Sequence, residues 1–154
     1  MGMYKYITES LQTMFKERGD RYKERLKEWR TKTVQPVAKP TNLSRARSLG
    51  YKAKEGYKLA IVKIKRGRRH RKHPDGGRKP GKNYRFTSRD VSLQTIAELK
   101  AAKKFGMEAM NSYFVGSDGI FKFFEVILLD KSLSAAKGRV ERGLTSSAKK
   151  GRGL

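Results

Sequence analysis

The sequence contains no cysteine and no run of apolar residues long enough to cross a membrane. Without cysteine there is no disulfide, no thiolate zinc site and no thiol nucleophile. A spanning helix needs roughly 18 consecutive apolar residues. The first residues, MGMYKYITESLQ, also lack the apolar stretch of a signal peptide. We therefore expect neither a membrane span nor a secretory leader.

Acidic residues are scarce as well. The 154 residues include 14 Asp and Glu against 38 Lys and Arg, a net charge of +24. A domain with this charge repels itself, so a polyanionic partner is expected. An anionic membrane surface could attract the charge, but the sequence has no amphipathic or lipidated anchor. Nucleic acid, with one phosphate charge per nucleotide, is the predicted partner.

Residues that could support catalysis or hold a metal are few. His70 and His73 are the only histidines, and the cations around them would repel a metal ion. The segment GGRKPGKN at 76–83 almost matches a phosphate-binding P-loop. However, Asn83 stands where a Ser or Thr holds magnesium, and the flanking strand and helix are missing. We predict no catalytic residue, no metal, no cofactor and no small-molecule substrate.

Four carboxylates in the second half of the chain form no catalytic motif. They are expected to pair with neighbouring Lys and Arg side chains, and they are Glu98, Glu108, Glu125 and Asp130.

Apolar spacing divides the chain into segments of one α+β domain, 1–154. Residues 1–30 predict two helices that are separated at Gly19, with Asp20 as the cap of the second helix. Residues 31–56 are basic and contain Pro36 and Pro40, which favour irregular backbone. One helical turn is expected there, before Gly50.

Residues 57–130 predict the body, a small, mostly antiparallel sheet with a helix. A β-branched strand is expected at 57–64, and a helix opened by Ser92 and closed by Gly106 follows it. Two further strands, at 111–115 and 120–129, flank a hairpin turn at 116–119. The last strand is apolar on both faces over its second half, so it should lie in the middle of the sheet.

Two basic extensions leave this body. The loop at 66–85 has nine Lys and Arg and no apolar period, so it cannot bury a core and should be disordered without a partner. A solvated charge run or a nuclear import signal would have a similar composition. The tail at 131–154 is basic too. Its last part lacks an apolar pattern, so truncation from residue 145 should hardly destabilise the body. Charge is scarcest at 107–130, where we expect the core.

Aromatic side chains among the basic residues are candidates for stacking on bases. A tyrosine at the start of a strand is also a common core residue, as Tyr57 would be. The candidates are Tyr51, Tyr57, Tyr84 and Phe86.

Several strings, taken in order along the whole chain, resemble the L15e family of eukaryotic and archaeal large-subunit ribosomal proteins. They are MGxYKY at 1–6, RARSLGYKAKxGY at 45–57, RGRR at 66–69, NSYFV at 111–115, KxFEVIL at 122–128 and RGLTSSAKKGRGL at 142–154. The family carries a Trp-containing segment that this chain lacks between Asp130 and Arg142.

The resemblance implies a structural protein whose extensions thread into ribosomal RNA of the large subunit in the cytoplasm, beside neighbouring ribosomal proteins. A chromatin-type DNA-compacting protein and an RNA-processing enzyme are the alternatives. The candidate rRNA-binding residues are Arg45, Arg47, Tyr51, Lys52, Lys54, Lys65, Arg66, Arg68, Arg69, His70, Arg71, Lys72, Arg78, Lys79, Lys82, Arg85, Arg142, Lys149, Lys150 and Arg152.

Overall fold

A four-stranded antiparallel sheet with the strand order β1-β2-β6-β5 forms the centre of the molecule. The computed structural model describes residues 2–70, 76–77, 86–132 and 138–154. The strands are β1 (Val34–Val37), β2 (Tyr57–Lys65), β5 (Glu108–Ser117) and β6 (Phe121–Leu129). The α+β fold with a mostly antiparallel sheet is therefore confirmed.

The most apolar strand, β6, lies between β2 and β5, as its sequence predicts. Its alternation sends Phe124 and Val126 to one face of the sheet and Phe123 and Ile127 to the other. The predicted β5–β6 hairpin is confirmed, but β5 is longer than expected and is shifted in register between Phe114 and Gly116.

The edge strand β1 contradicts the prediction of irregular backbone before Gly50. Val34 to Val37 pair with β2, and Pro36 lies opposite Ala60. Proline is tolerated at this position because β1 has a partner on one side only, so its missing N–H breaks no second ladder.

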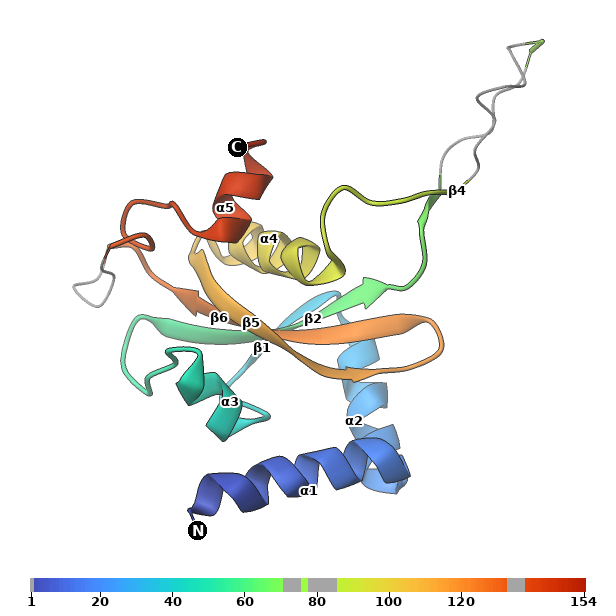
Figure 1. Ribbon diagram of the computed structural model, residues 1–154, viewed down its shortest axis with the longest axis vertical. Coiled ribbons are helices and arrows are strands. Elements are labelled where there is room, and N and C mark those ends of the chain that lie inside the picture. Colours follow the sequence, from blue (N-terminus) through green and yellow to red (C-terminus); the bar gives the residue numbers. More distant parts are fainter. Residues whose placement is uncertain (1, 71–75, 78–85, 133–137) are drawn as a thin grey trace.

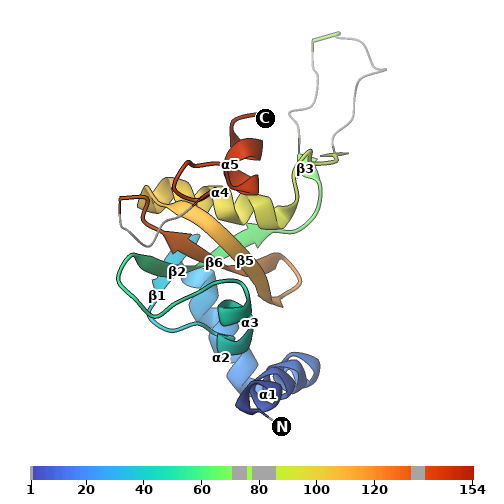
Figure 2. The same ribbon diagram turned by 60° about the vertical axis from the view of Figure 1, so that its left-hand side comes forward.

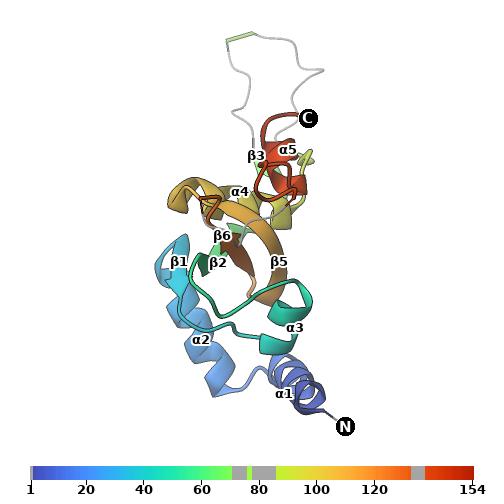
Figure 3. The same cartoon turned by 90° about the vertical axis from the view of Figure 1, so that its left-hand side faces the viewer.

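Helices cover both faces of the sheet (Figure 1, Figure 3). Helix α4 (Leu93–Phe105) lies on one face, and α2 (Asp20–Thr31) and α3 (Leu43–Ser48) lie on the other. Helix α1 (Met3–Glu17) runs outside this second layer, next to α2 and α3. The order of layers is thus helix, sheet, helix, with α1 as an outer addition.

The ends of α4 agree with the sequence, whereas the start of α2 does not. Ser92 caps α4 by accepting from the N–H of Thr95, and Gly106 closes the helix in the left-handed region at φ 65°. At α2 the cap residue is Gly19, which has no side chain to bond. Asp20 is instead the first helical residue, and its carboxylate accepts from Lys23 at 3.0 Å. The predicted capping role of Asp20 is therefore wrong.

The core is divided between the two faces. On the α4 side, Val62, Ile64 and Val126 pack against Ala97 and Ala101. On the opposite side, side chains of α2 meet β2 and β6, and Ala46 of α3 meets the same two strands and β5. These residues are Tyr22, Leu26, Trp29, Ile61 and Phe123 in the first group, and Ala46, Leu59, Tyr113 and Ile127 in the second.

The described parts of both extensions contain short elements that the sequence did not predict. At the base of the loop at 66–85, β3 (Arg69–His70) pairs with β4 (Phe86–Thr87), which follows the loop, in a two-stranded ribbon. In the tail, α5 (Ser146–Gly151) packs against α4, where Leu99 lies against Gly151. The expected small effect of truncation from residue 145 assumed a tail without contacts to the body, and this assumption is wrong; the effect of the truncation itself stays a prediction. Among the described residues, none of the helices has both the length and the apolar content for a membrane crossing.

Candidate nucleic-acid interface

The first group of predicted contacts lies on α3. Asn42 caps this helix by accepting from the N–H of Arg45 at 3.0 Å. The buried Ala46 faces the sheet, so Arg45 and Arg47 on either side of it are exposed. Gly50, in the left-handed region at φ 95°, then reverses the chain. The local sequence thus places two guanidinium groups on the surface.

The start of α3 is bonded to a buried carboxylate of β6. Glu125 accepts the backbone N–H of Thr41 at 3.0 Å and the hydroxyl of Tyr113 at 2.8 Å. Burial raises the pKa of Glu125, although both bonds oppose that rise. Burial and the carboxylate together raise the pKa of the Tyr113 hydroxyl. Three elements of the chain therefore meet at Glu125.

Helix α1 reaches the same surface, which the sequence did not predict. Arg47 donates to the Tyr4 hydroxyl, and its guanidinium carbon lies 5.8 Å from the centre of the Tyr4 ring. The occurrence of MGxYKY among the family strings is the sequence signal for this contact. Helix α1 therefore adds a contact to the side chain of Arg47, whose backbone belongs to α3.

The segment after α3 divides its candidates between the core and the surface. The rings of Tyr51 and Tyr57 meet edge to face at 6.1 Å and pack on the cluster around Ala46. Lys52 and Lys54 are exposed. The two tyrosines thus contribute to the core, and the two lysines are available to a partner.

The second group lies at the base of the loop at 66–85. The candidates Lys65, Arg68, Arg69 and His70 are exposed there. The imidazole of His70 meets the ring of Phe86 edge to face at 5.6 Å, and Phe86 is 56% exposed. Six predicted cations lie outside the described residues, and the lysine of the near P-loop, Lys82, is one of them. The six are Arg71, Lys72, Arg78, Lys79, Lys82 and Arg85. The stacking candidate Tyr84 also lies outside the described residues.

Arg66 connects this loop to the turn of the β5–β6 hairpin. Its guanidinium donates to the carbonyl of Asp118 at 3.0 Å. The Asp118 carboxylate accepts from Arg30 at 2.7 Å and from the N–H groups of Ile120 and Phe121. Burial disfavours the charge, but these donors prevail and lower the pKa of Asp118. The base of the loop is thus fixed by bonds to the body.

The third group lies around α5, and Arg142, Lys149, Lys150 and Arg152 are exposed there. Thr145 caps α5 by accepting from the N–H of Ala148 at 3.3 Å. Arg152 also donates to the carbonyl of Gly143 at 2.7 Å.

Glu108 anchors the start of this helix. Its carboxylate accepts from the hydroxyl of Thr145 and lies 3.1 Å from the ammonium of Lys131.

The prediction that four carboxylates pair with cations holds for Glu108 alone among the described contacts. Glu98 accepts from the Ser112 hydroxyl. Asp130 accepts from the N–H of Ser132 at 3.0 Å. Glu125 accepts from uncharged donors, as described above. The acids therefore act mainly as hydrogen-bond acceptors that join segments of the chain.

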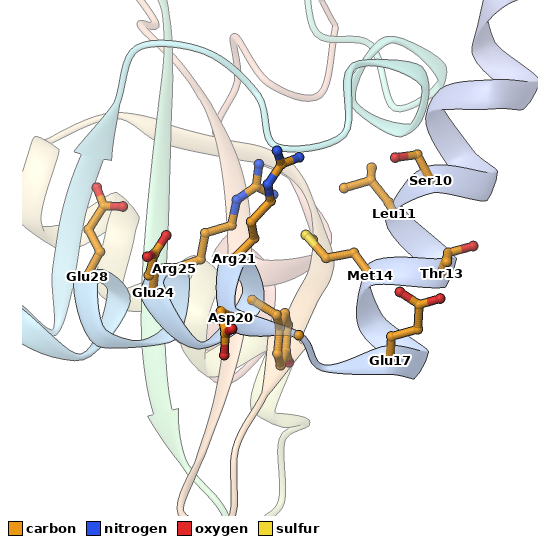
Figure 4. Close-up of a pocket in the computed structure, with 12 residues that line it drawn as sticks. Ser10, Leu11, Thr13, Met14, Glu17, Asp20, Arg21, Glu24, Arg25 and Glu28 are labelled. Atoms are coloured by element: carbon orange, nitrogen blue, oxygen red, sulfur yellow. The ribbon is translucent and has the colours of Figure 1, made fainter.

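A groove of about 800 Å³ lies between α1 and α2 (Figure 4). Figure 4 shows Arg21, Arg25 and Met14 directed into it, with carboxylates of both helices along its rim. None of the predicted contact residues that the structure describes lines it. Within the described part of the chain there is no group of three or more His, Asp or Glu that could hold a metal ion.

The three groups lie on different sides of the sheet (Figure 1, Figure 2). The β3–β4 ribbon and α5 lie on the side covered by α4, whereas α3 lies on the opposite side beside α1. The described part of the chain therefore displays cations in two directions and does not gather them into one cleft.

Comparison with known proteins identifies the family. A family model described as Ribosomal L15 matches residues 2–137. The chain belongs to the ribosomal L15e family. The resemblance seen in the sequence strings is thereby confirmed.

Members of the L15e family from three archaea illustrate the similarity, and each is named "Large ribosomal subunit protein eL15". The protein of Nanoarchaeum equitans is 39% identical over 100% of this chain and 90% of its own length. That of Methanocella arvoryzae is 43% identical over 97% and 86%. That of Metallosphaera sedula is 45% identical over 86% and 69%.

The alignment with the Nanoarchaeum protein spans 170 residues, more than the 154 of this chain. That L15e protein therefore contains residues without a counterpart here.

Proposed function

We propose that this chain is a structural constituent of the large ribosomal subunit that binds folded ribosomal RNA by neutralising phosphates. RNA segments that fold close together repel one another, and bound Lys and Arg lower this repulsion while condensed counterions are released. The family membership and the net charge of +24 support this role. Its site of action would be the ribosome in the cytoplasm.

One observation carries the proposal. Exposed cations are displayed by three elements that the body fixes in place, namely α3, the β3–β4 ribbon and α5. Cations that point in two directions suit a protein placed between RNA segments better than one that encloses a substrate. The role is therefore structural and not catalytic.

We propose that residues 1–154 act as one domain whose basic extensions make the RNA contacts. The contacts in the described part of the chain would be made by the exposed candidates on α3 and its following segment, on the ribbon and on α5. Candidates of the loop that lie outside the described residues, such as Lys82, remain proposed contacts. Recognition would rest mainly on RNA shape, because A-form helices hide their major-groove base edges. Neighbouring ribosomal proteins would be further partners.

Binding to a fragment of large-subunit RNA tests the proposal. The logarithm of the affinity should fall linearly with the logarithm of salt concentration, by about 0.7 to 0.9 per phosphate contacted. Arg45→Ala/Arg47→Ala should weaken binding and lower this slope by roughly one for each lost contact.

A matched control removes two arginines elsewhere. Arg21 and Arg25 are exposed on α2, among the carboxylates of the α1–α2 groove. Arg21→Ala/Arg25→Ala should therefore change RNA affinity less. Equal losses from both double substitutions, or a flat salt dependence, would contradict the proposal. Equally tight binding to duplex DNA of the same length would favour the chromatin-type alternative.

A further inference from the structure

Two glutamates of this strongly basic chain are buried in the body. Glu125 on β6 is 0% exposed and Glu108 on β5 is 5% exposed. Burying a carboxylate is unfavourable because water solvates the charge better than a protein interior does. An apolar side chain could fill either position without this cost. Packing alone therefore does not explain why glutamates occupy these two buried positions.

Glu125 is bonded directly to Thr41, and through the Tyr113 hydroxyl to Asn42, the two residues that precede α3. One carboxylate oxygen accepts the N–H of Thr41 at 3.0 Å, and the other accepts the Tyr113 hydroxyl at 2.8 Å. The oxygen of that hydroxyl lies 3.4 Å from the N–H of Asn42, the cap residue of α3. The carboxylate thus sets where the first turn of α3 begins.

Glu108 has the same relation to α5. Its carboxylate accepts from the hydroxyl of Thr145, the cap residue of that helix. The ammonium of Lys131, 3.1 Å away, balances the charge. In both cases a buried acid on the sheet is bonded at the start of a short helix that carries exposed cations.

Short helices need such support. Both α3 and α5 contain six residues, fewer than an isolated helix needs to be stable in water. If either helix were disordered before binding, its ordering would reduce the affinity for RNA. A fixed helix presents its cations without this loss.

We propose that Glu125 and Glu108 are positioning residues for RNA binding. Glu125 orients Arg45 and Arg47 through the start of α3, and Glu108 orients Lys149 and Lys150 through the start of α5. This inference rests on the RNA-binding function proposed above. Neither glutamate touches RNA, so each acts only through the cations of its own helix.

Double-substitution cycles test this selectivity with a fragment of large-subunit RNA. Glu125→Gln keeps the size of the side chain but replaces one acceptor oxygen with a donor. It should weaken binding about tenfold, the effect of losing the fixed orientation of two long side chains. The same substitution should have no further effect once Arg45→Ala/Arg47→Ala is present. In the Lys149→Ala/Lys150→Ala background it should retain its full effect.

Glu108→Gln should show the reverse dependence. Its effect should vanish in the Lys149→Ala/Lys150→Ala background and persist with Arg45→Ala/Arg47→Ala. A purely structural role would weaken binding in every background, so additive losses would overturn the proposal. Circular dichroism and the melting temperature of each variant show that it is folded during the measurement.

Two milder substitutions repeat the cycles if a glutamine variant unfolds. Tyr113→Phe removes the hydroxyl bonded to Glu125, and Thr145→Val removes the hydroxyl that is bonded to Glu108 and also caps α5. Additive losses with these variants would also overturn the proposal. If instead Arg45→Ala/Arg47→Ala alone leaves the affinity unchanged, the proposed RNA contact of α3 is wrong, and the role of Glu125 is wrong with it.

Discussion

At the scale of single residues, Gly116 determines how closely α2 approaches the sheet. A Cβ atom at this position would lie 2.9 Å from the hydroxyl oxygen of Tyr22 and 3.2 Å from a ring carbon of Trp29. Tyr22 cannot move away easily, because its hydroxyl both donates to the carbonyl and accepts from the N–H of Ser117, each at 2.9 Å. The register shift next to Gly116 therefore lets two aromatic rings pack on a bare backbone.

The first prediction concerns this contact. Gly116→Ala should lower the free energy of unfolding by about 1–3 kcal/mol, the usual effect of overpacking a well-filled core. Gly119 is the matched control, since a Cβ there meets nothing within 4 Å. Chemical denaturation of both variants gives the comparison. An equal loss in both would show that the close approach at Gly116 is not the cause.

The second prediction concerns pH and Glu125, whose pKa is raised above its ordinary value of 4.5 by burial. A carboxyl with a higher pKa in the folded state holds its proton more tightly there. Its contribution to stability is therefore fully present below pH 4.5 and is lost as the pH rises through the folded pKa.

Unfolding free energies of the wild type and Glu125→Gln, measured from pH 4 to 8, check this sign. The stability of the wild type relative to the variant should decrease as the pH rises. Glu141→Gln corrects for the loss of one carboxylate from the surface. A relative stability that increases with pH would mean that the bonds from Thr41 and Tyr113 outweigh burial.

At the scale of elements, long segments with local signals could be predicted from the sequence. The β5–β6 hairpin and helix α4 follow from apolar periodicity, a turn rich in glycine and the caps Ser92 and Gly106. The position of β6 inside the sheet follows from its lack of a polar face.

Among the short elements, the helical turn expected before Gly50 is confirmed as α3, whereas β1, the β3–β4 ribbon and α5 could not be predicted, because partners far away in the sequence stabilise them. Strand β1 contains a proline and forms only because β2 lies beside it. The ribbon β3–β4 pairs residues separated by a basic loop. Helix α5 has no apolar stripe, and its buried groups are the polar side chains of Thr145 and Ser147.

The candidate contact residues could likewise be predicted from the sequence only in part. Composition and family strings identify the basic residues of α3, the loop and α5. They do not show which candidate side chains already make contacts within the protein. Arg47 bonds to Tyr4, Arg66 bonds to the hairpin turn, and Tyr51 packs on Tyr57. These contacts depend on the tertiary fold, so no local pattern indicates them.

The third prediction follows from the anchoring of α5. Thr145→Ala removes a helix cap and leaves the buried Glu108 carboxylate without one donor. The free energy of unfolding should fall by about 1–3 kcal/mol. Ser146 is the adjacent control, since it is exposed and is the first residue of the helix. If both substitutions to alanine have the same small effect, α5 does not stabilise the body.

At the scale of the whole molecule, charge acts on folding and on binding in opposite directions. Between described residues, ion pairs join Lys5 to Glu9, Lys23 to Asp20, Arg30 to Asp118 and Lys131 to Glu108. Each pair joins one cation to one anion, so the net charge of +24 is unchanged and the free protein repels itself. The same excess of cations would attract RNA.

The fourth prediction uses salt to separate the two effects. At 0.1 M salt, charges more than about 10 Å apart on the surface are largely screened. Raising sodium chloride from about 0.01 to 0.1 M should therefore raise the melting temperature of the free protein while it weakens RNA binding. Lys149→Ala/Lys150→Ala should act in the same sense at low salt, with a higher melting temperature and a lower RNA affinity. Both lysines are exposed on α5, so their removal takes away repulsion without opening the core. A melting temperature that falls with added salt would mean that attractive ion pairs, and not repulsion, dominate the electrostatics of the folded chain.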